Sequence, residues 1–94
     1  MNEPVIGALS RPAVASGFRL QWEAAQNAHV LLFPEGMVKL NTSAGEILKR
    51  CDGTTSIADI TADLERAFTT SNLSEDVMRF VNTAVEKRWL KIPS

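Results

Sequence analysis

The chain has little of what a catalytic or metal-binding protein needs. Its 94 residues include one cysteine and one histidine, so these two residue types cannot supply an intrachain disulfide, a zinc site or an iron–sulfur ligand set. There is no glycine-rich loop that would cradle a phosphate, and His29 has no evident nucleophile as its partner. We therefore expect a protein that is not an enzyme and that binds neither a metal nor a cofactor.

Positive charge and long apolar runs are also scarce. The net charge of −1 and the pI of about 5.7 argue against non-specific binding to nucleic acid or to an anionic membrane. No apolar run approaches the about 18 residues of a membrane span, and no signal-peptide core follows the N-terminal charges. The sequence predicts a cytoplasmic protein with no nucleic-acid or membrane partner.

A composition of 45% hydrophobic and 22% charged residues is typical of one small globular domain. Residues 1–17 hold two prolines and two glycines and show no sustained periodicity. We expect them to form a flexible N-terminal arm. Residues 18–94 are then the folded domain.

Alternating apolar and polar residues indicate three strands. Phe18, Leu20 and Trp22 alternate with polar neighbours, and a more apolar stretch covers residues 29–33. Between residues 33 and 37 the Pro-Glu-Gly sequence favours a tight turn. Proline presets the angle φ at the first central position, and glycine readily adopts the left-handed conformation of the residue that follows. Residues 37–41 then return as a third, antiparallel strand.

Three helices follow, each with a start signal. Ser43 and Glu46 form a capping box for a helix that Gly53 ends. Ser56 begins the second helix, and Ser74 caps the third. Residues 89–92 close the chain as a short extended piece. The predicted fold is α+β, a three-stranded antiparallel β-meander followed by three α-helices.

The third strand has little protection against pairing. Lys39 is its only charged residue, so a visiting extended peptide can add to this edge by β-augmentation. Alternatively, the arm or a second copy of the chain covers the edge, and both a monomer and a homodimer are compatible with the sequence.

Apolar residues of the third helix spread over an arc of about 160°. Either two other elements cover this helix, or its free side lines a groove beside the strand.

Other candidate residues have ordinary explanations. His29 is either a solvated or hydrogen-bonded strand residue or a general base, and Cys51 is either a small buried apolar residue or a reactive thiol. Asp59 and Asp63 lie one turn apart on the polar side of the second helix. They form a solvated face or contact a partner enzyme, and the basic Lys49 and Arg50 are an equal candidate for that contact.

Several sequence motifs occur together in order over about residues 18–92. They are Leu20-Gln21-Trp22-Glu23, Leu31-Leu32-Phe33-Pro34-Glu35-Gly36-Met37-Val38, Leu40-Asn41 with Ser43-Ala44, Glu46-Ile47-Leu48, Cys51-Asp52-Gly53, Ile60 and Arg88-Trp89-Leu90. In this combination they resemble the PqqD family of pyrroloquinoline quinone (PQQ) biosynthesis.

The resemblance implies a fold, a function and a site. PqqD-like proteins are winged helix-turn-helix domains and RiPP recognition elements, which bind the ribosomal precursor peptide PqqA and present it to the radical SAM enzyme PqqE. In related domains the peptide becomes an extra strand beside the third strand and against the third helix. Carried onto this chain, that implies a non-catalytic peptide chaperone with a peptide-binding site at Met37, Val38, Lys39, Leu40, Asn41, Val77, Phe80, Val81 and Ala84.

A winged-helix DNA-binding regulator is the alternative function, since helix-turn-helix folds commonly place a helix in the major groove. The third helix begins with Glu75 and Asp76, and only Arg79 is basic in its first two turns. Phosphate backbones would repel that end of the helix. The sequence therefore favours the peptide chaperone.

Overall fold

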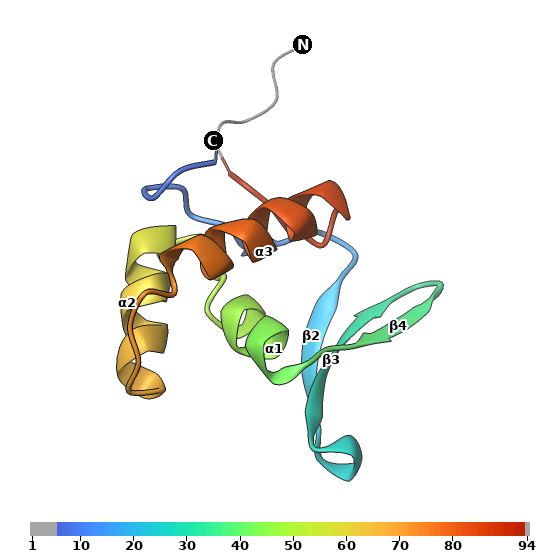
Figure 1. The fold of residues 1–94 in the computed structure, drawn as a ribbon. Coiled ribbons are helices and arrows are strands. Elements are labelled where there is room, and N and C mark those ends of the chain that lie inside the picture. The colour runs from blue at the N-terminus through green and yellow to red at the C-terminus, as the bar shows by residue number, and fades with distance from the viewer. Residues whose placement is uncertain (1–5, 94) are drawn as a thin grey trace.

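The computed structural model describes residues 6–93, which form two small sheets, three α-helices and one short 3-10 helix (Figure 1). In chain order the elements are β1 (Ala13–Val14), β2 (Arg19–Glu23), the 3-10 helix η1 (Ala24–Gln26), β3 (Ala28–Phe33), β4 (Gly36–Lys39), α1 (Thr42–Lys49), α2 (Ile57–Ala67), α3 (Ser74–Glu86) and β5 (Leu90–Lys91). Strands β2, β3 and β4 form an antiparallel sheet in that order, and β1 pairs with β5. The predicted meander and three helices are confirmed.

The β3–β4 hairpin forms as the turn chemistry predicts. Phe33 pairs with Gly36, so Pro34 and Glu35 occupy the two central positions of the turn. Gly36 has a φ of +156°, which residues with a side chain rarely adopt. The third strand, predicted over residues 37–41, is shorter than expected and ends at Lys39.

One face of the three-stranded sheet packs against the helices. Leu20, Leu31 and Val38 lie side by side across the three strands, and the side chain of Leu31 is fully buried. Helix α1 crosses this face so closely that a Cβ added to Gly45 would lie 2.7 Å from Nδ1 of His29. Glycine at this position allows the close approach of helix and strand.

Two of the predicted helix starts are wrong by one or two residues. Helix α1 is capped by Asn41, whose side chain accepts a hydrogen bond from the Ala44 amide at 2.8 Å, and not by Ser43. Asparagine caps as well as serine does, and it comes first in the chain. This helix ends at Lys49, before Gly53. Ser74 is the first residue of α3, and no side chain caps that helix.

The start of α2 agrees with the prediction. The Ser56 hydroxyl accepts a hydrogen bond from the Asp59 amide at 3.1 Å. Two further amides of this first turn, those of Ile57 and Ala58, donate to the carbonyl oxygens of Ser10 and Ala8 at 2.9 Å each. The N-terminal segment thus satisfies donors that have no partner within the helix.

This docking differs from the flexible arm that we expected over residues 1–17. Residues 13 and 14 form β1, which pairs with Leu90 and Lys91, and Pro12 is fully buried. Backbone hydrogen bonds, which the side-chain pattern does not reveal, hold the segment to the domain. Residues 1–5 of the expected arm lie outside the described residues. The described part of the arm pairs with β5 and not with β4.

The hydrophobic core lies between the sheet and the three helices. Its buried members are Leu31, Leu40, Ala44, Ile47, Leu48, Cys51, Ile57, Ile60, Leu64, Val77, Val81, Ala84 and Leu90. Over the described residues 6–93, none of the helices has both the length and the apolar character needed to span a membrane.

Candidate functional site

Strand β4 has one edge that no other described strand occupies. The Leu40 amide donates to the carbonyl oxygen of His29 at 3.0 Å, which makes these two residues a hydrogen-bonded pair. Such pairs alternate along an antiparallel ladder, so the backbone groups of Val38 also point toward β3. The amide and carbonyl groups of Met37 and Lys39 therefore point away from the sheet, toward the free edge.

The five strand-side residues named from the sequence thus have different places in the structure. Met37 and Lys39 are exposed and direct their backbone groups outward, whereas Val38 packs its half-buried side chain against the core. Leu40 is buried and lies beyond the end of β4. Asn41 is exposed and caps α1. The free edge of β4 is consequently centred on Met37 and Lys39.

Three of the four residues named on the third helix are buried. Val77, Val81 and Ala84 are at most 1% exposed, and only Phe80 keeps part of its surface free. Helix α3 packs on α2 and β5, so other elements cover most of its wide apolar arc. These residues were chosen by helical phase, which identifies the middle of the apolar face. The middle of that face packs into the core, whereas residues that line a groove lie at its border.

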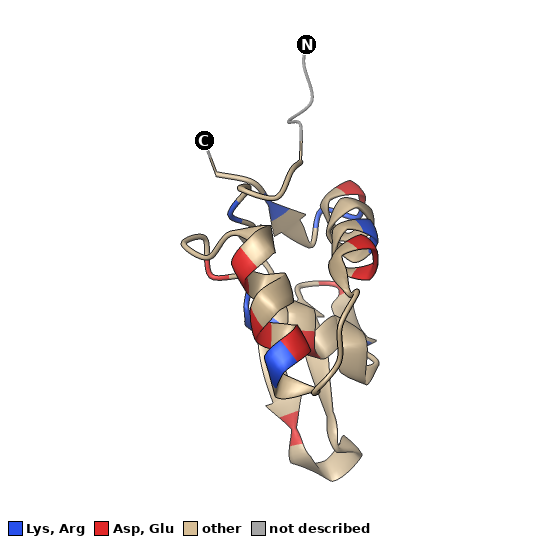
Figure 2. Cartoon of the chain, turned by 60° about the vertical axis from the view of Figure 1, so that its left-hand side comes forward, with Lys and Arg blue, Asp and Glu red and all other residues tan. Residues whose placement is uncertain are grey.

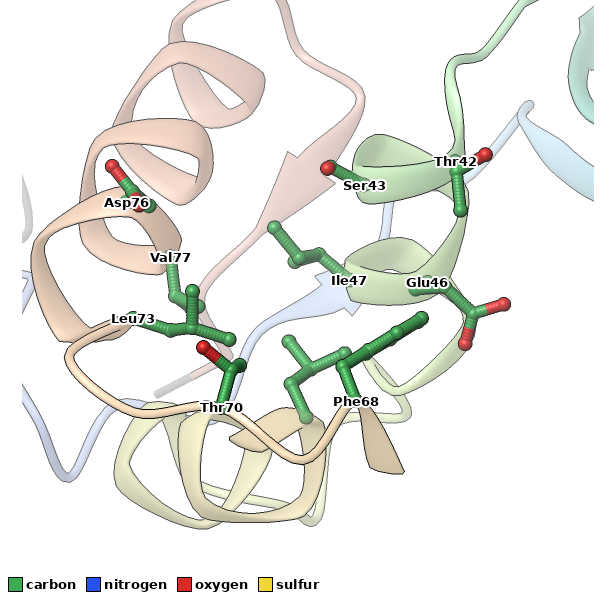
Figure 3. A pocket seen from close by; sticks show the side chains of 10 residues that line it. Thr42, Ser43, Glu46, Ile47, Phe68, Thr70, Leu73, Asp76 and Val77 are labelled. Carbon is green, nitrogen blue, oxygen red and sulfur yellow. The ribbon is translucent and has the colours of Figure 1, made fainter. Parts of the chain in front are cut away.

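A pocket of about 270 Å³ lies between α1, the end of α2 and the start of α3 (Figure 3). Ile47 projects into it from α1, while Leu73 and Val77 approach from the opposite side. Phe68, which is 49% exposed, forms the lower wall. The remaining lining residues are Thr42, Ser43, Glu46, Leu64, Thr70 and Asp76. This pocket could not be predicted from the sequence, because residues from three separate elements form it.

Arg50 joins α1 to α2 beside this pocket. Its guanidinium group lies 2.8 Å from Glu46 and 2.6 Å from Asp63. The hydrogen bond from Arg50 lowers the pKa of Glu46, and a second one lowers the pKa of Asp63. Both carboxylates therefore stay ionised below their usual range of pH. Arg50 and Asp63 therefore form an ion pair between two helices, which was neither of the roles expected for them from the sequence.

The single cysteine and the single histidine both pack against neighbouring elements. Burial raises the pKa of the Cys51 thiol to about 12, and its sulfur donates to the Ile47 carbonyl oxygen at 3.2 Å. His29 packs edge-on against Trp22, with 5.0 Å between the ring centres, and touches Gly45. Within residues 6–93, no three His, Cys, Asp or Glu side chains gather where they would hold a metal ion.

Charges of both signs are spread over the molecule, and the ribbon of Figure 2 carries acidic segments on both α2 and α3. Each of these helices holds more acidic than basic residues, with Arg66 and Arg79 as the only basic ones. Arg79 is paired with Asp76 at 3.1 Å. This charge distribution does not suit a helix that enters a DNA groove.

Comparison with known proteins assigns this chain to a family. The family model described as coenzyme PQQ synthesis protein D (PqqD) matches residues 28–90. The chain belongs to the PqqD family. A PqqA binding protein of Azotobacter vinelandii is 52% identical over 86% of this chain and 89% of its own length. The PqqA binding protein of Stutzerimonas stutzeri is 46% identical with the same coverage.

Two solved PqqD structures share the fold. The PqqD part of Methylobacterium extorquens PqqCD, described as a stand-alone RiPP recognition element, is 26% identical, with a TM-score of 0.77 over 93% of this chain and 95% of that one. The crystal structure of Xanthomonas campestris PqqD is 36% identical, with a TM-score of 0.57 over 94% and 100%. The resemblance stated from the sequence motifs is confirmed.

Proposed function

We propose that this protein is a non-catalytic chaperone that binds the precursor peptide PqqA and presents it to the radical SAM enzyme PqqE in the cytoplasm. The names of its relatives, PqqA binding protein, support the peptide as the ligand. One observation carries the binding mode: the outward backbone groups of Met37 and Lys39 on the free edge of β4. PqqA adds there as a fourth strand.

The other edge of the sheet is better protected than β4. On β2 the Arg19 side chain donates to Gln21 at 3.1 Å, and Gln21 donates to Glu23 at 2.9 Å. Two opposite charges thus flank this strand, and charged residues discourage edge pairing. Strand β4 has only Lys39. This contrast supports β4 as the docking edge.

The surroundings of Cys51 and His29 fit a binding protein better than an enzyme. The Cys51 thiol is buried and protonated at neutral pH, and His29 is packed between Trp22 and α1. Neither side chain is placed as an activated nucleophile or a base beside one. Family membership and the acidic start of α3 favour this role over that of a DNA-binding regulator.

A pair of substitutions at Lys39 tests the binding mode. Lys39→Pro removes the outward amide, yet it leaves the ladder with β3 intact, because Lys39 and Val30 are not a hydrogen-bonded pair. The guest carbonyl group then lacks its donor, which costs about 1–3 kcal/mol, or about 5- to 150-fold in affinity. Lys39→Ala is the matched control, since it keeps the amide and removes only the side chain.

Calorimetric titration of both variants with synthetic PqqA measures the difference. We expect a large loss of affinity for Lys39→Pro and a small one for Lys39→Ala. Wild-type affinity of the folded proline variant would contradict strand addition at β4. Folding is checked by far-ultraviolet circular dichroism of each variant.

A further inference from the structure

The outer face of the three-stranded sheet, which points away from the helices, carries packed side chains of its own. Gln21, Val30 and Lys39 lie side by side across the three strands on this face. Val30 is fully buried, although it lies outside the hydrophobic core. Long polar side chains cover apolar surface with their stems and keep their polar ends in water. Lys39 therefore flanks Val30 with its stem, and its ammonium group lies on the outer face beside the free edge.

The charged side chains of β2 have partners on this face, whereas Lys39 of β4 has none. Arg19 donates to Gln21 at 3.1 Å and Gln21 donates to Glu23 at 2.9 Å, so these three side chains form a hydrogen-bonded row. Every ion pair found within residues 6–93 has an arginine as its cation, so Lys39 takes part in none of them. The edge that is open to a guest strand thus presents an ammonium group without a carboxylate partner in the described part of the chain.

A strand that adds to β4 brings its own side chains to this face, next to Lys39. Residues directly opposite each other on neighbouring strands share a face, with their Cβ atoms about 4.5–5.5 Å apart. The Lys39 ammonium group can therefore form an ion pair with a carboxylate on the guest residue that lies opposite it. A lysine or arginine at that guest position would place two like charges side by side, which is destabilising.

We propose that Lys39 selects an aspartate or glutamate of the precursor peptide and thereby fixes the register in which the peptide pairs with β4. Main-chain hydrogen bonds alone do not distinguish one register from another. A slip by one residue would turn the guest carboxylate to the opposite face of the sheet, away from the ammonium group. The inference rests on the proposed function and adds a charged contact on the outer face to main-chain pairing.

Charge reversal by Lys39→Glu tests this contact, with Lys91→Glu as the matched control. Both lysines are exposed strand residues, but Lys91 lies on β5, in the other sheet. Calorimetric titration with synthetic PqqA should show affinity about tenfold weaker for Lys39→Glu, because an attractive pair becomes a repulsive one, and unchanged affinity for Lys91→Glu. The loss should shrink at high salt. Equal affinity of wild type and folded Lys39→Glu would overturn the contact, even if Lys39→Pro still weakened binding.

Substitutions in the peptide identify the guest residue. Each aspartate and glutamate of PqqA is replaced in turn by lysine, and each variant peptide is titrated into wild type and Lys39→Glu. One replacement should weaken binding to wild type about tenfold and restore binding to Lys39→Glu, whereas the others should affect both proteins alike. The lack of any such charge-swapped pair would refute the selection of an acidic residue. Failure of strand addition itself would be recognised separately, by wild-type affinity of Lys39→Pro.

Discussion

Replacing Gly45 with alanine perturbs the contact that places α1 on the sheet. The new Cβ would lie 2.7 Å from Nδ1, 3.0 Å from Cβ and 3.1 Å from Cγ of His29. Two of these atoms belong to the rigid base of the side chain, so rotation of the ring cannot relieve the overlap. The helix or the strand must therefore shift.

The expected cost follows from two opposing effects. Overpacking of this kind costs about 1–3 kcal/mol. Replacing glycine inside a helix by alanine recovers about 0.8–1 kcal/mol of helix propensity. We expect Gly45→Ala to lower the free energy of unfolding by about 1 kcal/mol, which lowers the Tm of a domain of this size by about 4–8 °C.

A second substitution separates the two effects. In the His29→Ala background the Nδ1 and Cγ atoms are gone and only the Cβ at 3.0 Å remains, so the same Gly45→Ala change should cost clearly less stability. Urea unfolding of the four proteins, followed by circular dichroism, measures the coupling between the two positions. An equal effect of Gly45→Ala in both backgrounds would refute the close approach of α1 to β3.

Three other outcomes follow from the structure. Hydrogen bonds from Thr54 and Thr55 hold the pKa of Asp52 at about 2, below the usual 3.8, so its stabilising contribution is complete above about pH 4 and is lost as the pH falls to 2. Urea unfolding should show Asp52→Asn less stable than wild type at pH 7, with the difference shrinking toward pH 2; a constant difference would contradict this. Deletion of residues 1–12 exposes amides of α2 and should lower stability by at least about 2 kcal/mol in the same assay, whereas an unchanged midpoint would show that the segment is dispensable. The Cys51 thiol should react with a thiol reagent at pH 8 only on unfolding, and rapid reaction of the native protein would contradict its burial.

Much of the fold was predictable because local patterns dominate it. The alternation around Leu20, the Pro34 turn and the Ser56 cap each depend on neighbours close in sequence, and each is confirmed. The docked N-terminal segment was not predictable in this way. Its partners are backbone groups of Gly53, Ile57 and residues of β5, and backbone hydrogen bonds leave no side-chain signature.

The candidate site was predictable only in part. The weakly protected strand could be recognised from its composition. Which of its backbone groups point to the free edge, however, depends on the pairing of Leu40 with His29. Val81 and Ala84 show the limit of helical phase, since the centre of an apolar arc packs into the core. The place of Phe68 in a pocket wall could not be predicted, because residues of three separate elements form that pocket.

Hydrogen exchange of the β4 amides with and without PqqA tests strand addition most directly. The amides of Val38 and Leu40 already point toward β3, so the peptide should change their protection little. Those of Met37 and Lys39 point to the free edge and should become protected only when the peptide is bound. Protection gained instead at Leu20 and Trp22 of β2, or nowhere on the sheet while the peptide is bound, would contradict the account.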